Sequence, residues 1–175
     1  DLYILGQVPE EIDAVAAPFL DNPLAVLAST NHPLARAKNI PVQSLSEEAF
    51  IMREPGSGTR MATERFFTDR GLKINIRMEL GSNEAIKQAI VGELGVAVLS
   101  RHTLALDAPM GQLVMLDVEG FPLKRSWYYA YPSGKQLSIV AETFLEYLRQ
   151  APDFLVDLSC YHASIGCCPL LSKGK

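Results

Sequence analysis

The sequence predicts an α/β domain with a largely parallel sheet, because short apolar runs alternate with segments of helical period. Two consecutive segments give the clearest signal, since each has an apolar strand, a turn and then a helix. With 175 residues, 48% of them hydrophobic, the chain can form one ordinary domain with a sizeable core, or a domain and part of a second.

The N-terminal part predicts two strands. Residues 2–5 are an apolar run that Gly6 ends, and residues 7–13 form a polar loop. Residues 24–28 are a second apolar run, and the residues on both sides of it are typical of turns. We therefore expect strands over residues 2–5 and 24–28.

The middle of the chain repeats the order strand, turn, helix. Residues 50–52 predict a strand, residues 53–60 a glycine-rich turn, and residues 61–69 a helix that Gly71 ends. Residues 74–80 then predict a strand, residues 81–84 a turn, and residues 85–91 a helix. A buried strand over residues 96–99 follows, so this region forms the body of the domain.

The last elements are two strands and a helix. Residues 113–116 and 127–131 predict strands on either side of a turn at residues 119–122. An amphipathic helix is expected over residues 138–149. Its period is marked by apolar residues that begin just before it, at Leu137, Val140, Ala141, Phe144, Leu145 and Leu148.

The composition changes over residues 151–175, which predict an irregular tail without an assigned function. All three cysteines lie there, at Cys160, Cys167 and Cys168. We interpret them as unpaired thiols, because the adjacent pair is poorly spaced for a metal site even with His162 as a further ligand. No metal and no cofactor is expected.

The formal net charge of −4, with scattered Lys and Arg, predicts that this chain alone does not bind DNA. No stretch approaches the roughly 20 consecutive apolar residues that span a bilayer, and the first residues lack the basic start of a signal peptide. We therefore expect a cytoplasmic protein that does not contact a membrane.

The beginnings of two predicted helices are candidate anion sites. Ser57, Gly58 and Thr59 precede one helix, and Ser82 and Asn83 precede the other. Unpaired amides and the helix dipole attract anions to such termini, and glycine allows a ligand to approach the backbone. The alternative is that these polar residues only cap their helices, because their types are the preferred N-caps.

Arginines near these turns are further candidates. Arg60 opposes the dipole of its own helix unless an anion or a carboxylate lies in front of it, so it is a candidate ligand clamp. Arg53 and Arg77 could serve as clamps in the same way, but we interpret them as solvated or paired with a neighbour such as Glu54 or Glu79.

No catalytic residue is predicted. The turn after residue 52 has neither the P-loop nor the dinucleotide-binding pattern of glycines. His32 and His102 each lie beside a turn or a strand end, without a paired nucleophile, and are interpreted as surface or hinge residues.

Several segments together resemble the effector-binding domain of LysR-type transcription regulators. They are residues 22–28, 32–35, 50–60 and 95–100. The run at residues 53–60, followed by residues 81–87, is most similar to the CbbR/CmpR branch, which controls carbon-fixation and bicarbonate-uptake genes. The resemblance extends from residue 1 to about residue 150.

The resemblance implies a periplasmic-binding-protein-like (type II) fold of two subdomains, one complete and the other a remnant. Residues 1–19 and the helix within residues 132–150 would belong to subdomain I, residues 20–131 to subdomain II, and residues 151–175 to the tail. The longer parent would be a homotetramer that binds DNA only through a helix-turn-helix domain absent from this chain.

By the same resemblance, a small anionic, phosphorylated metabolite would bind in the cleft between the subdomains. The implied effector-binding residues are Gly6, Gln7, Ser57, Gly58, Thr59, Arg60, Ser82 and Asn83. Two other functions share the scaffold: a secreted solute-binding protein, and an enzyme of the prephenate dehydratase kind. The second has a Thr-Arg-aromatic segment, whereas Met61 follows Thr59-Arg60 here.

Overall fold

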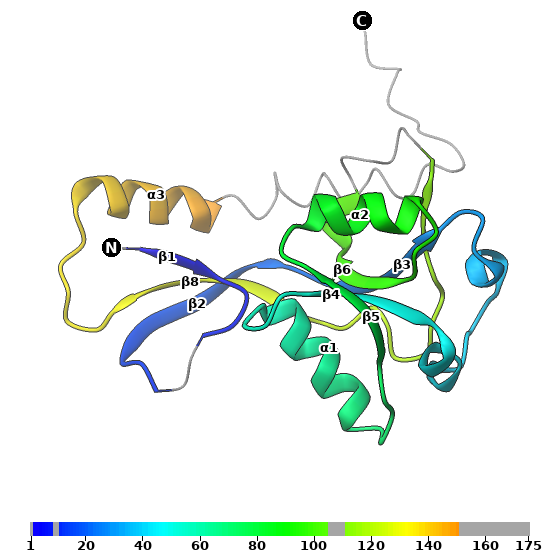
Figure 1. Ribbon diagram of the computed structural model, residues 1–175. Coiled ribbons are helices and arrows are strands. Elements are labelled where there is room, and N and C mark those ends of the chain that lie inside the picture. Colours follow the sequence, from blue (N-terminus) through cyan, green and yellow to red (C-terminus); the bar gives the residue numbers. More distant parts are fainter. Residues whose placement is uncertain (1, 9–10, 105–110, 151–175) are drawn as a thin grey trace, which may run out of the picture.

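The computed structural model describes residues 2–8, 11–104 and 111–150 and forms two lobes (Figure 1). The small lobe is an antiparallel sheet in the order β1-β8-β2, with a helix above it. Its elements are β1 (Tyr3–Leu5), β2 (Ala14–Asp21), β8 (Ser126–Pro132) and α3 (Ile139–Gln150). The tail predicted over residues 151–175, with its cysteines and His162, lies outside the described residues.

The large lobe contains the other strands. They are β3 (Leu24–Ser29), β4 (Ala49–Arg53), β5 (Asn75–Leu80), β6 (Ala97–Ser100) and β7 (Leu113–Met115). A parallel bridge between Phe50 and Val96 joins β4 to β6 and gives the order β5-β4-β6-β3-β7. Only β3 runs against the others, so the expected largely parallel sheet is confirmed in this lobe but not in the small one.

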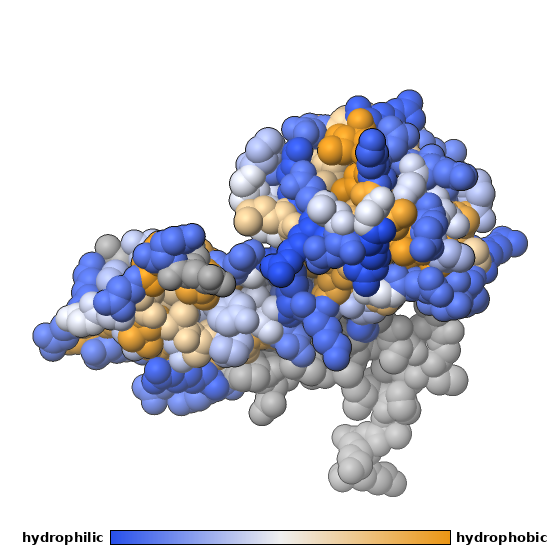
Figure 2. Space-filling model, turned by 90° about the horizontal axis from the view of Figure 1, so that it is seen from below, coloured by the Kyte–Doolittle hydropathy of each residue, from blue (hydrophilic) through white to orange (hydrophobic). Residues whose placement is uncertain are grey.

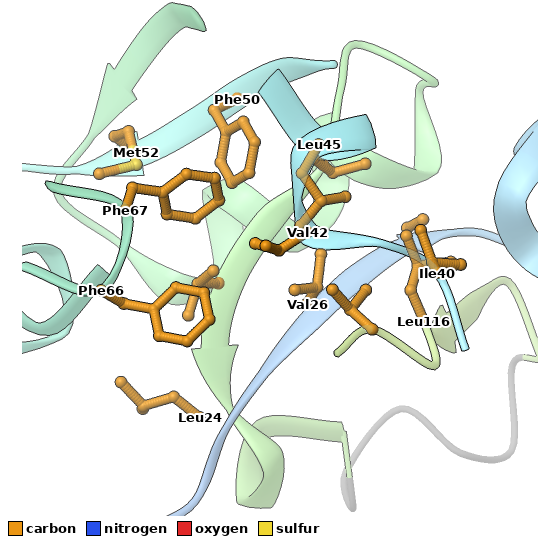
Figure 3. Packing of buried hydrophobic residues seen from close by; sticks show 14 residues of the cluster. Leu24, Val26, Ile40, Val42, Leu45, Phe50, Met52, Phe66, Phe67 and Leu116 are labelled. Carbon is orange, nitrogen blue, oxygen red and sulfur yellow. The ribbon is translucent and has the colours of Figure 1, made fainter. Parts of the chain in front are cut away.

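Two helices cover opposite faces of the large sheet (Figure 1). Side chains alternate along β3, so Leu24 and Val26 face α1 (Gly58–Thr68), while Ala25 and Leu27 face α2 (Asn83–Val91). Figure 3 shows the α1 side, where the ring of Phe67 meets Phe50 edge-on with 5.5 Å between centroids. Burial on both faces explains why β3 is apolar throughout.

The sequence analysis missed β2 and the short 3-10 helices. β2 is eight residues long, but its sequence AVAAPFLD contains a proline and no polar alternation. The helices are η1 (Pro33–Arg36), η2 (Val42–Glu47) and η3 (Arg101–Leu104). Of these, η2 contributes Val42 and Leu45 to the core in front of α1.

The helix α3 packs on the small sheet through Leu145 and Leu148, which contact Tyr129. Two other members of its predicted stripe remain on the surface, because Val140 is 80% and Phe144 46% exposed. Figure 2, seen from the side opposite α3, shows further apolar surface on the small lobe. This lobe therefore buries less apolar surface than the large one.

Two antiparallel segments connect the lobes. β2 continues into β3 through Asn22, and the chain returns to β8 through Leu123 and Arg125. The backbone N–H of Asn22 donates to the carbonyl of Arg125 (2.6 Å), and Leu24 and Leu123 exchange two hydrogen bonds (3.0 and 2.8 Å). β8 thus pairs within the small lobe, although the division at residues 20 and 131 assigns it to subdomain II; that division stays a prediction.

Gly95 lies where β6 meets β4, and the space there does not admit a side chain. Gly95 has φ +154°, and an added Cβ would overlap the carbonyl oxygen of Ala49. Because backbone rather than a flexible side chain would have to move, we expect Gly95→Ala to lower the free energy of unfolding by at least about 2 kcal/mol. Urea denaturation measures this.

Gly81→Ala is the matched control, because an added Cβ there meets nothing within 4 Å. Its unfolding free energy should stay within about 0.5 kcal/mol of the parent. Equal effects of the two substitutions would contradict the strand junction described here.

Candidate functional site

An open cavity of about 610 Å³ lies where the two lobes meet. The small lobe contributes Gly6 and Gln7 after β1, and the large lobe contributes Ser57, Gly58 and Thr59 at the start of α1. Further lining comes from Leu5, Glu11, Asn22, Arg53, Gly56, Met61, Arg125 and Trp127. The structure therefore brings together residues from both lobes that the sequence analysis had named.

The start of α1 presents its backbone to this cavity. Gly58 is the first helical residue, and the first amides of a helix have no partner within it. Ser57 occupies the N-cap position but makes no side-chain cap hydrogen bond. The capping interpretation therefore does not account for Ser57, which lines the cavity together with Thr59.

The start of α2 is arranged differently. The Ser82 hydroxyl accepts a hydrogen bond from the backbone N–H of Ala85 (3.5 Å), so Ser82 caps this helix. The side-chain oxygen of Asn83 accepts from the guanidinium of Arg53 (2.8 Å). Neither residue lines the cavity, and Asn83 contacts Arg53, which does line it.

Arg53 and Glu54 form a two-pronged ion pair, as the sequence analysis expected. Two guanidinium nitrogens of Arg53 lie 2.7 and 2.8 Å from the two carboxylate oxygens of Glu54. These hydrogen bonds lower the pKa of Glu54. Arg77 is exposed and donates to the carbonyl of Leu94 (3.2 Å).

Arg60 is occupied by carboxylates rather than directed into the cavity. Its guanidinium nitrogens lie 2.7 Å from oxygens of Glu79 and of Glu64, and its side chain is 13% exposed. The hydrogen bonds to Glu79 and Glu64 raise the pKa of Arg60. The clamp role of Arg60 stays a prediction, but the carboxylates already supply the negative charge that its position requires.

The sequence analysis missed Arg125. Its guanidinium donates to the carbonyl of Gly58 (2.8 Å) in the large lobe and to that of Gly6 (2.6 Å) in the small lobe. Burial lowers the pKa of Arg125, since desolvation disfavours the charged form. Its sequence neighbourhood carries no motif, so only the fold reveals that it reaches both turns.

The histidines have structural partners. His32 accepts a hydrogen bond from the backbone N–H of Leu34 (3.2 Å), and its other ring nitrogen lies 3.4 Å from Glu48. His102 bonds the carbonyl of Asp21 (2.7 Å), next to the segment that joins the lobes. Both contacts agree with the surface or hinge interpretation.

Within residues 2–8, 11–104 and 111–150, no group of three or more His, Cys, Asp or Glu side chains could hold a metal ion. A search of the same part of the chain finds no helix that could span a membrane.

Comparison with known proteins gives a family match over nearly the whole described chain. A family model described as "LysR substrate binding domain" matches residues 1–153. The HTH-type transcriptional activator CmpR of Synechocystis is 55% identical over 148 residues, which are 85% of this chain and 49% of that protein. The RuBisCO operon transcriptional regulator of Acidithiobacillus ferrooxidans is 52% identical over 151 residues, 86% of this chain and 49% of that protein.

Solved structures give the same result. The Synechocystis CcmR regulatory domain, solved in complex with 2-PG, has a TM-score of 0.83 and 54% identity, and the match covers 86% of this chain and 73% of that one. The effector-binding domain of QuiR, in complex with shikimate, has a TM-score of 0.77 at 19% identity, covering 88% and 72%, which shows the shared fold alone. The chain spans about half the length of the curated relatives that it matches.

The two helix starts predict different effects of the same substitution. Ser82→Ala removes a cap hydrogen bond, so we expect the free energy of unfolding to fall by about 1 kcal/mol. Ser57→Ala removes none and should change it by less than about 0.5 kcal/mol. Urea denaturation of both variants tests this; a larger effect at Ser57 would show that Ser57 acts as a cap.

Proposed function

The chain belongs to the LysR substrate-binding domain family, and from this premise we propose that it is the effector-sensing part of a transcription regulator of the CbbR/CmpR kind. The observation that carries the proposal is the cavity between the lobes, formed in a chain that is 54% identical to a regulatory domain solved with 2-PG. The regulated genes would be those of carbon fixation, because the relatives include regulators of RuBisCO operons.

We propose that the effector is a small phosphorylated anion such as 2-phosphoglycolate. It would lie against the first amides of α1, where the helix dipole favours negative charge, and accept hydrogen bonds from Ser57 and Thr59. Gly6 and Gln7 would contact it from the small lobe. Arg60, Ser82 and Asn83 would act through the cavity wall rather than by touching the ligand, since none of them lines it.

We propose that contact with DNA is made by a segment outside this chain. Relatives are named HTH-type regulators and are about twice as long as the matched region, and the net charge of this chain is −4. Such a regulator would act in the cytoplasm and assemble as a homotetramer. Its subdomain II would span residues 20–131, with β8 pairing against strands β1 and β2.

The two alternatives find less support. The named relatives of this chain are transcription regulators, which favours a role without catalysis over a prephenate dehydratase-like reaction. Their names favour a regulator over a secreted solute-binding protein in the same way. Incubation with prephenate, with product formation followed by absorbance, would reveal turnover if the enzyme hypothesis were correct.

The site can be tested by calorimetric titration with 2-phosphoglycolate. We expect the parent chain to bind and Ser57→Ala/Thr59→Ala to bind at least about tenfold more weakly, because a hydrogen bond to a charged group contributes about 1.5–3 kcal/mol. Thr68→Ala, on the exposed far end of α1, serves as the control and should bind like the parent.

Ser82→Ala distinguishes the two helix starts. Unchanged affinity of this variant for 2-phosphoglycolate would restrict the site to the α1 turn. A loss of affinity would extend the site to the start of α2, as the sequence predicts. If the parent binds neither 2-phosphoglycolate nor any other phosphorylated acid, the proposed effector class is wrong.

A further inference from the structure

Two glycines of the cavity lie beside the same side chain, that of Arg125. An added Cβ at Gly6 would lie 3.3 Å from the Nη2 atom of Arg125, and an added Cβ at Gly58 would lie 3.2 Å from the same atom. Neither glycine has the left-handed φ that would itself favour glycine. A side chain at either glycine would therefore lie close to the guanidinium, although the turn itself does not require glycine there.

The same guanidinium joins the two lobes. It bridges the carbonyl of Gly58 at the start of α1 and the carbonyl of Gly6 after β1, at 2.8 and 2.6 Å. The backbone carbonyl of Arg125 also accepts a hydrogen bond from Asn22 on the other connecting segment. Arg125 thus fixes the spacing of the walls between which a ligand would lie.

The charge of Arg125 is not balanced by a carboxylate of the described residues. Arg53 and Arg60 each have a glutamate within 2.7 Å, but no ion pair joins Arg125 to an acidic side chain in that part of the chain. Arg125 is partly buried, and its two carbonyl acceptors carry only partial negative charge. A half-buried cation with this environment favours an incoming anion.

We propose that Arg125 is the residue that recognises the charge of the effector, and that its bonds to Gly6 and Gly58 hold the lobes at the separation that fits the ligand. This inference rests on the proposed function and assigns the main charge contact of the same cavity. A guanidinium has five N–H donors, and the two carbonyls leave others for a phosphate.

Protonation of the phosphate provides a readout that a purely structural role would not affect. A phosphate monoester carries about −2 charge above its second pKa of about 6 and about −1 below it. If Arg125 contacts this group, affinity for 2-phosphoglycolate should rise as the pH increases through that range. Removing the cation should flatten this rise as well as lower the affinity.

The experiment compares the parent chain with Arg125→Gln and Arg125→Lys by calorimetry with 2-phosphoglycolate and glycolate, from about pH 5 to about pH 7.5. For Arg125→Gln we expect at least about a tenfold loss of affinity for 2-phosphoglycolate, a flattened pH profile, and a smaller preference over glycolate. Arg125→Lys keeps the charge but cannot form the fork, so it should bind weakly and keep the slope.

Arg36→Gln is the matched control, because Arg36 is exposed on η1 and does not line the cavity. It should reproduce the affinity and the pH profile of the parent. Melting curves of all variants establish that they fold. If Arg125→Gln does not fold, Arg125→Lys provides the test. An Arg125→Lys variant that binds as tightly as the parent would then refute a role for the forked geometry of the guanidinium.

The outcomes separate the two proposals. A parent that binds and an Arg125→Gln variant with an unchanged pH slope would overturn the role of Arg125 and leave the proposed function intact. A parent that binds neither ligand at any pH would overturn 2-phosphoglycolate as the proposed effector and this inference together.

Discussion

The burial of β3 on both faces is the constraint on which the rest of the structure depends. All six residues from Leu24 to Ser29 are buried, between α1 on one side and α2 on the other. A one-residue shift of such a strand would exchange the side chains that face α1 with those that face α2, and both packed faces would be disrupted. Because β3 is the direct continuation of β2, the position of the small lobe is fixed by how the chain leaves this strand.

The cavity is a consequence of that connection. Asn22 lies between β2 and β3, is 3% exposed, and accepts a hydrogen bond from the Ser100 hydroxyl at 2.5 Å. Its backbone N–H binds the returning segment at Arg125, so the two connections form one unit. A ligand against the α1 turn would therefore contact both lobes near the segments that connect them. At this position a small change in the angle between the lobes alters the separation of their far ends.

How much the sequence predicted depended on whether the signal was local. The α/β class, both helices of the large lobe and the α1 turn follow from hydrophobic period and turn chemistry, which are local properties. β2 was missed because its alanines and Pro18 give no alternation, and its partner β8 is more than 100 residues away. The stripe predicted for α3 was partly wrong, since Val140 lies on the surface.

The arginines also show that the sequence predicts local interactions but not the distant charges that pair with them. The sequence singled out Arg60 because a cation opposes the dipole at the start of a helix. Glu64, one turn further along α1, and Glu79 on β5 neutralise that cation, and the pairing with Glu79 is visible only once β5 lies beside β4.

Arg125 carries no such signal in its own segment. Its acceptors are the backbone carbonyls of two glycines, and carbonyl positions are not encoded by residue type. Gly6 and Gly58 lie beside the guanidinium, but nothing in the sequence indicates that Arg125 approaches them. A cation held by carbonyls keeps its full charge for a ligand, whereas one paired with two carboxylates does not.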